Sequence, residues 1–302
     1  MTQVVDRPTR RGATPSRQVP VGRPRQESRV KVVLYLLAAV LSVLVFVVPL
    51  VWALMRSLQP NATITSAPDL STFFKLTFDN FRGIADQGHI PRAVLNSLIV
   101  SGGTAVLTTL LATSAGYGFG RFTFRGSGIT FGLIIVTLMI PFQAILTPLF
   151  MQLNAMHLTD SLLGLVLFYS TVNLPFGVFV MRTAFSSIPT ELEDAASIDG
   201  AGTMRTFTHV LRPLVVPGMA TTALYAFLAA WTEFLGALTF LTRQDLYTLP
   251  LSLVNLQQGA YGQVNYGYLA AGSVIAMVPC VILFVALQRF YVAGLSAGAV
   301  KG

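Results

Sequence analysis

The chain has 302 residues, of which 53% are hydrophobic and only 11% are charged, and its mean hydropathy is positive. This composition excludes an ordinary soluble domain, in which about a quarter of the residues carry charge, and it indicates a membrane protein. The single cysteine, Cys280, excludes an intramolecular disulfide, and the three histidines lie too far apart in the sequence to suggest a metal site.

The first 31 residues form a basic, polar segment that precedes the first apolar run. Eight of the 20 Lys and Arg residues lie in it, among Pro, Gly, Ser and Gln. Because the segment has no apolar pattern, we expect residues 1–31 to be a disordered cytoplasmic tail close to anionic lipid headgroups. The net charge of +8 therefore does not indicate a nucleic-acid partner, and the basic stretch is too long for a signal peptide.

Six stretches further along the chain each supply the roughly 20 mainly apolar residues that a transmembrane helix needs. They are Val32–Met55, Ala93–Gly120, Gly128–Phe150, Ser161–Met181, Gly218–Leu241 and Tyr268–Leu287. Between the first two, residues 77–84 carry apolar side chains at helical spacing, which predicts a short surface helix. We therefore predict an all-α polytopic protein with a six-span membrane domain over residues 32–290 and a C-terminal tail over 291–302.

The distribution of positive charge between the loops predicts the orientation in the membrane. If the N-terminus is inside, 15 Lys and Arg residues lie on the cytoplasmic side and 5 lie on the outer side. Cytoplasmic loops carry an excess of Lys and Arg, so this arrangement is favoured, and an even number of spans returns the C-terminus to the cytoplasm.

Small residues on two spans indicate where helices pack closely in the membrane. The second span has Ser101, Ala105, Thr109, Ala112, Gly116 and Gly120, and the fifth has Ala226, Ala229, Ala230, Gly236 and Ala237. Glu233 lies on the same stripe of the fifth span. A carboxylate exposed to hydrocarbon costs several kcal/mol, so Glu233 is expected to face the helix bundle or a water-filled cavity.

Four polar or amphipathic side chains within the spans are candidates for the substrate pathway: Gln143, Asn173, Trp231 and Glu233. Gln143 follows Pro141 and Asn173 precedes Pro175, so carbonyls freed by each proline lie next to an amide side chain. Such a polar notch suits a hydroxyl-rich solute. Hydrogen bonding between helices is the alternative role for these residues.

The longest polar interruption in the second half of the chain is residues 187–217, SIPTELEDAASIDGAGTMRTFTHVLRPLVVP, called the polar hairpin below. Thr190 followed by Glu193 predicts a helix start with a capping box, and Gly200 predicts a left-handed helix end. A second helical pattern starts at Thr203, and Pro213 and Pro217 are expected to end it. From periodicity alone, the hairpin is a helical pair lying on the membrane surface.

The amino-acid sequence of the polar hairpin resembles the EAA loop of ATP-binding-cassette (ABC) importer permeases. That pattern is Glu-Ala-Ala, a Gly after three residues, and Ile-x-Leu-Pro after nine more; its counterparts here are Asp194, Ala195, Ala196, Gly200, Val210 and Pro213. Asp194 replaces Glu, Val210 replaces Ile and Arg212 replaces Leu. The C-terminal run Gln288–Gly302 is similar to the tail of many sugar-importer permeases, and the whole pattern is closest to the maltose-type second permease subunit.

This resemblance implies a type I ABC importer permease fold in the cell membrane and a set of partner proteins. The expected partners are a second permease subunit, two cytoplasmic ATPase subunits and an extracytoplasmic solute-binding protein, besides membrane lipid. The ATPase contacts implied for this chain are Glu191, Glu193, Asp194, Ala195, Ala196, Asp199, Gly200, Ala201, Phe207 and Pro213. The implied cargo is a disaccharide, a short oligosaccharide or a compound like glycerol phosphate.

No lysine of the chain lies in a P-loop sequence, so the chain is not expected to hydrolyse ATP, and ATP and Mg²⁺ would be used by the partner ATPase. No cofactor of its own is expected. An alternative function is a secondary carrier that works alone, driven by ions or protons, with Glu233 as the coupling acid. A membrane enzyme has little support, because the spans contain no His, no paired carboxylates and no Ser-His-Asp set, and no catalytic residue is predicted.

Overall fold

A computed structural model describes residues 29–60, 75–87, 89–257 and 264–299, and every regular element in these residues is helical. The predicted N-terminal tail lies outside the described residues except for residues 29–31, which already belong to helix α1 (Arg29–Ser57). The chain divides into two units, residues 1–50 and 51–302. Within the first unit, residues 30–50 of α1 expose many apolar side chains, as expected of a helix that contacts lipid.

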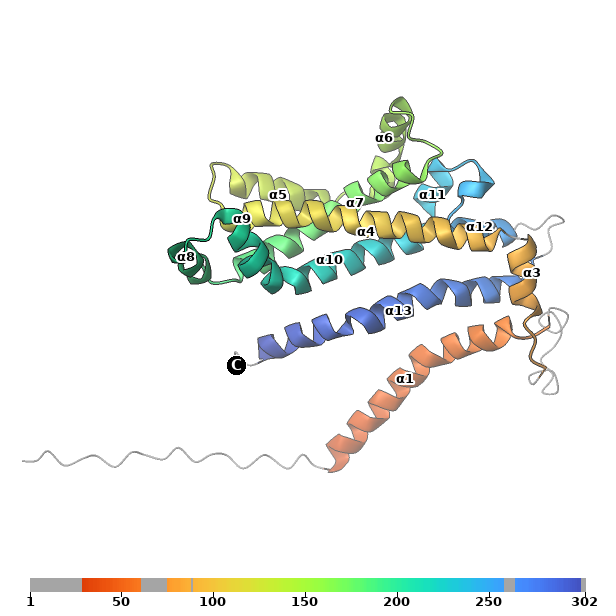
Figure 1. The fold of residues 1–302 in the computed structure, drawn as a ribbon. Coiled ribbons are helices and arrows are strands. Elements are labelled where there is room, and N and C mark those ends of the chain that lie inside the picture. Colours follow the sequence, from red (N-terminus) through yellow and green to blue (C-terminus); the bar gives the residue numbers. More distant parts are fainter. Residues whose placement is uncertain (1–28, 61–74, 88, 258–263, 300–302) are drawn as a thin grey trace, which may run out of the picture. The chain divides into compact units, whose positions relative to one another are not determined.

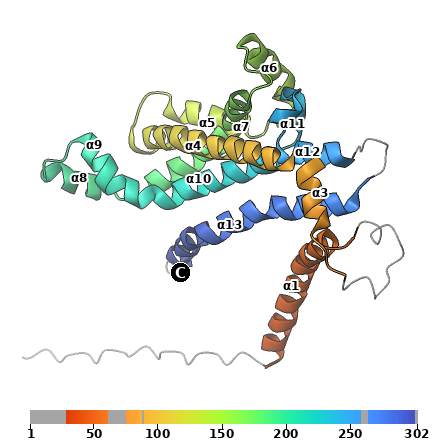
Figure 2. The ribbon, with the colours of Figure 1, turned by 45° about the vertical axis from the view of Figure 1, so that its right-hand side comes forward.

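The second unit is built around three long helices that pack side by side, α4 (Ile90–Arg121), α7 (Leu162–Ser186) and α10 (Arg212–Thr232) (Figures 1 and 2). The other helices of this unit are α3 (Asp79–Gln87), α5 (Ser127–Thr137), α6 (Phe142–Ala155), α8 (Glu191–Ile198), α9 (Thr203–Thr206), α11 (Leu235–Phe240), α12 (Leu249–Gln257) and α13 (Tyr266–Ala299). Helix α8 lies at one end of the three-helix bundle, and α11 and α12 lie at the other. The predicted surface helix over residues 77–84 is confirmed as α3, displaced by two to three residues.

Small residues bring α4, α7 and α10 into close contact, as the stripe on the second span predicted. A side chain at Gly116 of α4 would place its Cβ 2.8 Å from the backbone nitrogen of Arg182 on α7. At Gly177 of α7, a Cβ would lie 2.9 Å from both the Ala112 methyl of α4 and the Thr222 methyl of α10. The backbones therefore approach too closely for larger residues, and the three helices behave as one packed block.

Within the described ranges, five helices are long and apolar enough to cross a membrane, and they overlap five of the six predicted spans. The third predicted span, Gly128–Phe150, is wrong as a single straight helix: it consists of α5 and α6, which meet at an angle of 100°. The break falls just before Pro141, which has no N–H to donate and disfavours helical geometry at the residue before it. If this bent pair counts as one span, the described residues contain six.

The fifth predicted span, Gly218–Leu241, has different limits in the structure. A continuous helix runs from Thr203 to Thr232, so the prediction that Pro213 and Pro217 end the second helix of the polar hairpin was wrong. Residues Phe207–Leu211 form a single π-helical turn immediately before α10. The wider turn relieves the clash between the Pro213 ring and the carbonyl four residues earlier, so the helix continues. At the other end, the helix stops at Glu233.

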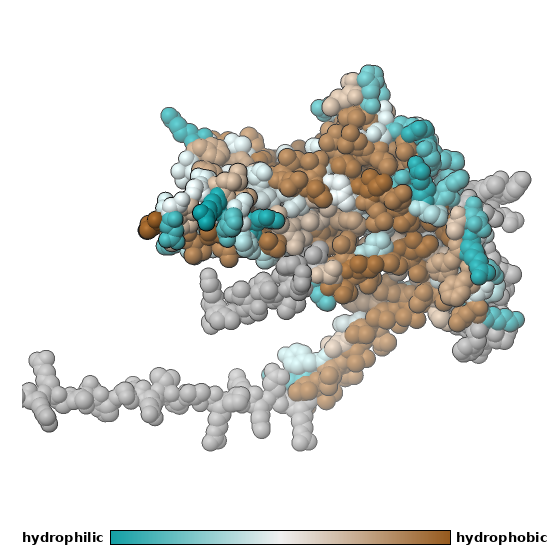
Figure 3. Space-filling model, in the orientation of Figure 1, coloured by the Kyte–Doolittle hydropathy of each residue, from teal (hydrophilic) through white to brown (hydrophobic). Residues whose placement is uncertain are grey.

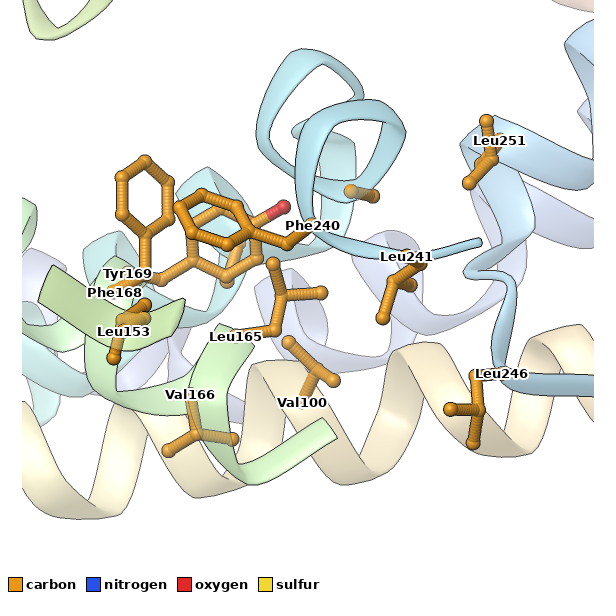
Figure 4. Close-up of a cluster of buried hydrophobic side chains, with 12 residues drawn as sticks. Val100, Leu153, Leu165, Val166, Phe168, Tyr169, Phe240, Leu241, Leu246 and Leu251 are labelled. Carbon is orange, nitrogen blue, oxygen red and sulfur yellow. The ribbon is translucent and has the colours of Figure 1, made fainter. Parts of the chain in front are cut away.

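Two features distinguish the ends of the second unit: the aromatic packing of α11 and the distribution of polar residues. An aromatic cluster fixes α11 against α7: Figure 4 shows Phe240 beside Phe168 and Tyr169, and the ring centroids of Phe168 and Phe240 lie 4.8 Å apart. On the face shown in Figure 3, polar residues gather toward the two ends of the bundle, while the middle is mainly apolar. This distribution fits a bundle whose sides face lipid and whose ends face water.

Candidate functional site

The first helix of the polar hairpin, α8, does not begin as predicted. Thr190 has helical backbone angles, φ −68° and ψ −24°, and its side chain makes no capping hydrogen bond. The carboxylate of Glu193 does not return to the Thr190 backbone; it pairs with Arg121 at the end of α4. The predicted capping box was therefore wrong, because a tertiary contact competes successfully for the Glu193 side chain.

The prediction that Gly200 ends α8 in a left-handed conformation is confirmed. This residue has φ +76°, in the left-handed region, and no atom blocks the position of a Cβ. The backbone N–H of Ala201 donates to the Ala196 carbonyl and that of Gly200 donates to the Ser197 carbonyl, at 2.9 and 3.0 Å. This pair of bonds is a Schellman motif, which ends the helix sharply and sets the direction of the chain toward α9.

Arg121 makes the polar connection between the bundle and the polar hairpin. Its Nη2 lies 2.7 Å from Glu193 Oε1, and its Nη1 donates to the Ile188 carbonyl at 2.9 Å. The Arg121 side chain is 7% exposed and that of Glu193 is 26% exposed, so the pair is largely shielded from water. The other two acids of the first turn, Glu191 and Asp194, are exposed.

An aromatic cluster lies next to this ion pair. The Tyr117 ring of α4 contacts the rings of Phe122, Phe185 and Phe207, with centroid distances of 5.2, 5.3 and 5.1 Å. Phe185 belongs to α7 and Phe207 to the π turn, so the cluster joins both long helices to the second arm of the polar hairpin. Phe207, predicted as an ATPase contact, is half-buried in this cluster.

The remaining residues of the predicted coupling set divide by exposure. Ala195, Asp199, Gly200 and Pro213 are exposed, Ala201 is half-buried, and Ala196 is the buried residue of α8. The sequence interpretation missed two apolar side chains at the tip of the polar hairpin, Ile198 and Met204, which are 87% and 74% exposed. The sequence could have indicated them, because both are large apolar residues next to a polar helix end. Such exposed side chains are typical of a contact surface.

Glu233 lies where the fifth span breaks, between α10 and α11. Its Oε1 accepts a hydrogen bond from the Leu235 N–H at 2.8 Å, and its Oε2 accepts bonds from the Gly236 N–H at 2.8 Å and the Tyr169 hydroxyl at 2.5 Å. The expectation that Glu233 faces the bundle is confirmed by the contact with Tyr169 of α7. Its carboxylate satisfies the free N–H groups of α11, which is a structural role for an acid inside a membrane protein.

The other three candidates for the substrate pathway do not converge on Glu233. Asn173 is buried, and its Nδ2 donates to the Tyr169 carbonyl of its own helix at 2.7 Å. Trp231 is buried, and its indole N–H donates to the Ala276 carbonyl of α13 at 3.0 Å. Gln143 is exposed in the first turn of α6. Trp231 also lines an open, mainly apolar pocket of about 450 Å³ between α10, α12 and α13.

The end of the bundle away from the polar hairpin has its own polar contacts. Asp160, between α6 and α7, accepts backbone hydrogen bonds from Thr242 and Arg243 through Oδ1, and its Oδ2 lies 3.2 Å from Arg243 Nε. Partial burial raises the pKa of Asp160, but these N–H groups and the Arg243 cation outweigh it, so the net pKa lies below its usual value. An open pocket of about 660 Å³ lies nearby, lined by His89, Arg92, Arg243, Gln244 and Asp245.

In the part of the chain that the structure describes, no three His, Cys, Asp or Glu side chains come together in a way that could hold a metal ion. The distinctive feature of this end of the bundle is a short helix with an exposed apolar tip, joined to the packed helices by a shielded ion pair and by the aromatic cluster around Tyr117.

Comparison with known proteins extends this description. Residues 109–296 match the sequence profile of the family described as binding-protein-dependent transport system inner membrane component. The chain is 33% identical to the trehalose transport system permease protein SugB of Mycobacterium tuberculosis, over 84% of this chain and 92% of that protein. It is 30% identical to the trehalose/maltose transport system permease protein MalG of Thermococcus litoralis, over 92% and 99%. It is 36% identical to the arabinooligosaccharides transport system permease protein AraQ of Halalkalibacterium halodurans, over 85% and 91%.

Solved structures agree with the fold. A chain of a bacterial ABC transporter involved in the import of the acidic polysaccharide alginate superimposes with a TM-score of 0.74 at 20% identity, covering 88% of this chain and 99% of that one. A second structure of an alginate ABC transporter, in complex with an alginate pentasaccharide-bound periplasmic protein, gives a TM-score of 0.62 at 16% identity. The predicted all-α importer-permease fold is confirmed.

Proposed function

Since the chain belongs to the family of inner membrane components of binding-protein-dependent transport systems, we propose that it is a permease subunit that couples a separate ATPase to the import of a sugar. The observation that carries the coupling role is the polar hairpin, whose α8 helix ends at Gly200 and presents Ile198 and Met204 to a partner. The absence of a P-loop in the sequence supports ATP hydrolysis, with its Mg²⁺, in a different subunit.

The proposed partners are a second permease subunit, cytoplasmic ATPase subunits, expected to number two, and an extracytoplasmic solute-binding protein. A structural neighbour of this chain belongs to an alginate transporter crystallised with a periplasmic protein, which supports the last of these. The chain is a multi-pass membrane protein. The excess of Lys and Arg in alternate loops supports an orientation with both termini and the polar hairpin in the cytoplasm.

A sugar is the proposed cargo because relatives of this chain carry the names of sugar systems. Besides trehalose, maltose and arabinooligosaccharides, they include a diacetylchitobiose uptake system permease of Streptomyces coelicolor, 32% identical over 85% of this chain. These names support a disaccharide or a short oligosaccharide. Among the four candidates, Trp231 is the proposed pathway residue, because it lines a mainly apolar pocket and such pockets bind small molecules.

Movement of the polar hairpin supplies the proposed mechanism. When the ATPase subunits close on nucleotide, they displace α8, and the packed block of α4, α7 and α10 tilts as one body between outward-open and inward-open states. The chain's own contribution is to transmit displacement, since a ligand or motor can shift an equilibrium only by acting differently on its two states.

A transport assay in proteoliposomes tests this function against the secondary-carrier alternative. The chain is reconstituted with the second permease and ATPase proteins encoded beside it, and labelled trehalose or maltose is supplied with the neighbouring binding protein. We expect uptake only with ATP and all subunits present. Uptake by this chain alone, driven by a proton or sodium gradient and abolished by Glu233→Gln, would overturn the proposal. The structural role of Glu233 favours the ATP-driven outcome.

A further inference from the structure

Helix α8 is attached to the membrane helices at few points. Two short turns connect it in sequence, residues 187–190 to α7 and residues 199–202 to α9. Among the described residues, the ion pair between Arg121 and Glu193 is the one that joins the polar hairpin to the long helices. Because α8 has only eight residues, a side-chain contact with a long helix would help it to move together with the bundle.

The geometry of Arg121 suits this task. It is the last residue of α4, and its guanidinium contacts both Glu193 on α8 and the carbonyl of Ile188 in the turn before α8. Two contacts from one planar group to two points of the polar hairpin fix an orientation as well as a distance. Because the Arg121 side chain is 7% exposed, water cannot readily replace these contacts.

The acids of α8 thus have two different surroundings. Glu193 points toward Arg121, whereas Glu191 and Asp194 are exposed on the same helix turn. Glu193 therefore serves an internal contact, and the exposed acids and the apolar tip remain for the partner subunit. This division goes beyond the set of ATPase contacts predicted from the sequence, which included all three acids alike.

Helix α4 is the appropriate recipient of the displacement. It packs against α7 and α10, and Gly116, five residues before Arg121, brings its backbone against that of α7. A force on Glu193 therefore reaches the whole block through Arg121, independently of the covalent path through the two turns.

We propose that Arg121 is a positioning residue for energy coupling: its ion pair with Glu193 and its bond to the Ile188 carbonyl make α8 and α4 one rigid body. The proposal rests on the proposed function, because it requires that movement of the ATPase displaces α8. Loss of the contact leaves ATPase binding and ATP hydrolysis in place but lowers the amount of sugar moved for each ATP.

The test compares four proteins in the reconstituted transporter: wild type, Arg121→Ala, Glu193→Gln, and the exchange Arg121→Glu with Glu193→Arg. Arg125→Ala is the matched control, since Arg125 is an exposed arginine four residues further on. Membrane content, ATPase capture and sugar transported per ATP are measured for each. We expect the two single variants to capture the ATPase and to lower transport per ATP by at least about fivefold. The exchange restores part of the coupling, and the control resembles wild type.

A distance measurement examines the rigid contact without any partner. Spin labels are placed at the exposed residues Ser114 of α4 and Ser197 of α8 after the native thiol is removed by Cys280→Ser. We expect one narrow distance distribution in the otherwise wild-type chain and a broad one after Arg121→Ala. The distance measurement does not depend on capture of the ATPase. If the wild-type chain captured no ATPase, the proposed function would be contradicted, but the rigid contact between α8 and α4 would still be tested.

Two results overturn the proposal. One is wild-type transport per ATP in Arg121→Ala or Glu193→Gln, together with an unchanged distance distribution. The other is a loss that appears only as less protein in the membrane, with normal transport per ATP in the protein that remains, which would show a purely structural role. Where Arg121→Ala fails to accumulate, Glu193→Gln decides, because it removes the charge of the more exposed partner.

Discussion

The two ends of α4 are held by contacts of different kinds. At its first turns, Asn96 donates to the carbonyls of Asp245 and Tyr247 at 2.9 and 3.0 Å, and the Ser97 hydroxyl accepts from the Leu249 N–H at 2.7 Å. At its last residue, Arg121 pairs with the Glu193 side chain. Neutral bonds to the backbone hold a loop in place, whereas the charged pair joins a helix to a helix. The difference suggests that one end is fixed and the other transmits force.

The carboxylates of the two ends follow the same division. Glu233 and Asp160, both away from the polar hairpin, accept hydrogen bonds from backbone N–H groups. On α8, Glu191 and Asp194 stay exposed, and the neighbouring tip presents Ile198 and Met204. Groups satisfied inside the chain stabilise it, and groups left exposed on a short helix are available to a partner. The following predictions test this contrast, from the largest expected effect to the smallest.

Replacing Gly200 by Val should disrupt the turn after α8, at the end of the bundle proposed to transmit force. A β-branched residue at φ +76° is strained by about 1–3 kcal/mol. The turn that directs α8 toward α9 would change, and we expect uptake to fall to about a tenth or less, since each 1.4 kcal/mol is a factor of about ten. Uptake and membrane content are both measured. Gly202→Val is the control, because Gly202 has φ −72° and open space around it; equal uptake by the two variants would contradict the role of the turn.

Replacing Ile198 by Ala should weaken the contact with the ATPase without altering the fold. Ile198 is 87% exposed, so its burial by a partner would contribute about 1.5–3 kcal/mol, and truncation should lower the affinity about tenfold. Titration of the purified ATPase onto the detergent-solubilised permease measures this. Ile129→Ala alters a similarly exposed apolar residue on α5, outside the polar hairpin sequence, and should have no effect. Unchanged affinity for Ile198→Ala would place the contact elsewhere.

At the other end, Glu233→Gln should lower stability more than coupling. Gln has one oxygen where Glu233 uses two, so at least one N–H of α11 or the Tyr169 hydroxyl loses its acceptor, at a cost of about 1–3 kcal/mol. Thermal unfolding in detergent measures the loss, and Tyr169→Phe, which removes a single donor, should give a smaller one. Sugar transport per ATP should persist in Glu233→Gln; its abolition would indicate that the carboxylate takes part in transport.

The contacts of Asp160 predict a modest dependence of stability on acid. Its pKa is lowered in the folded protein from an ordinary value of 3.8, so the ionised form stabilises the fold above that pH. This contribution is lost as the pH falls through the lowered value. The difference in melting temperature between wild type and Asp160→Asn should therefore shrink from pH 7 toward pH 3. Asp86→Asn, at an exposed aspartate of α3, serves as control, and a constant difference would contradict the role of the carboxylate.

Much of this architecture is readable from local sequence. Apolar runs of about 20 residues predicted five of the membrane helices because lipid requires such runs wherever the backbone crosses it. Gly200 was predicted as a left-handed helix end because glycine alone adopts that geometry without strain. The stripe that includes Ala112 and Gly116 predicted close packing, since a missing side chain is what lets two backbones meet.

The errors concern residues at which a local distortion of the backbone or a distant contact overrules the sequence pattern. Pro213 favours a helix end, but the π turn before it lets the helix continue to Thr232. Glu233 was expected within a helix and instead lies at a break, where it accepts bonds from α11 and from Tyr169. The 100° bend at Pro141 falls inside a run that composition alone makes continuous.

Sequence by itself determined the membrane class, the approximate positions of five apolar helices, and the position of the polar hairpin, because burial in lipid and turn chemistry act over a few neighbouring residues. Only the tertiary structure decided which acid of α8 points inward. Glu193 and Asp194 are adjacent and chemically alike, yet Glu193 meets Arg121, a residue 72 positions earlier in the chain. The physical reason is that an ion pair depends on where two helices bring their side chains together, and that placement is a property of the packed bundle.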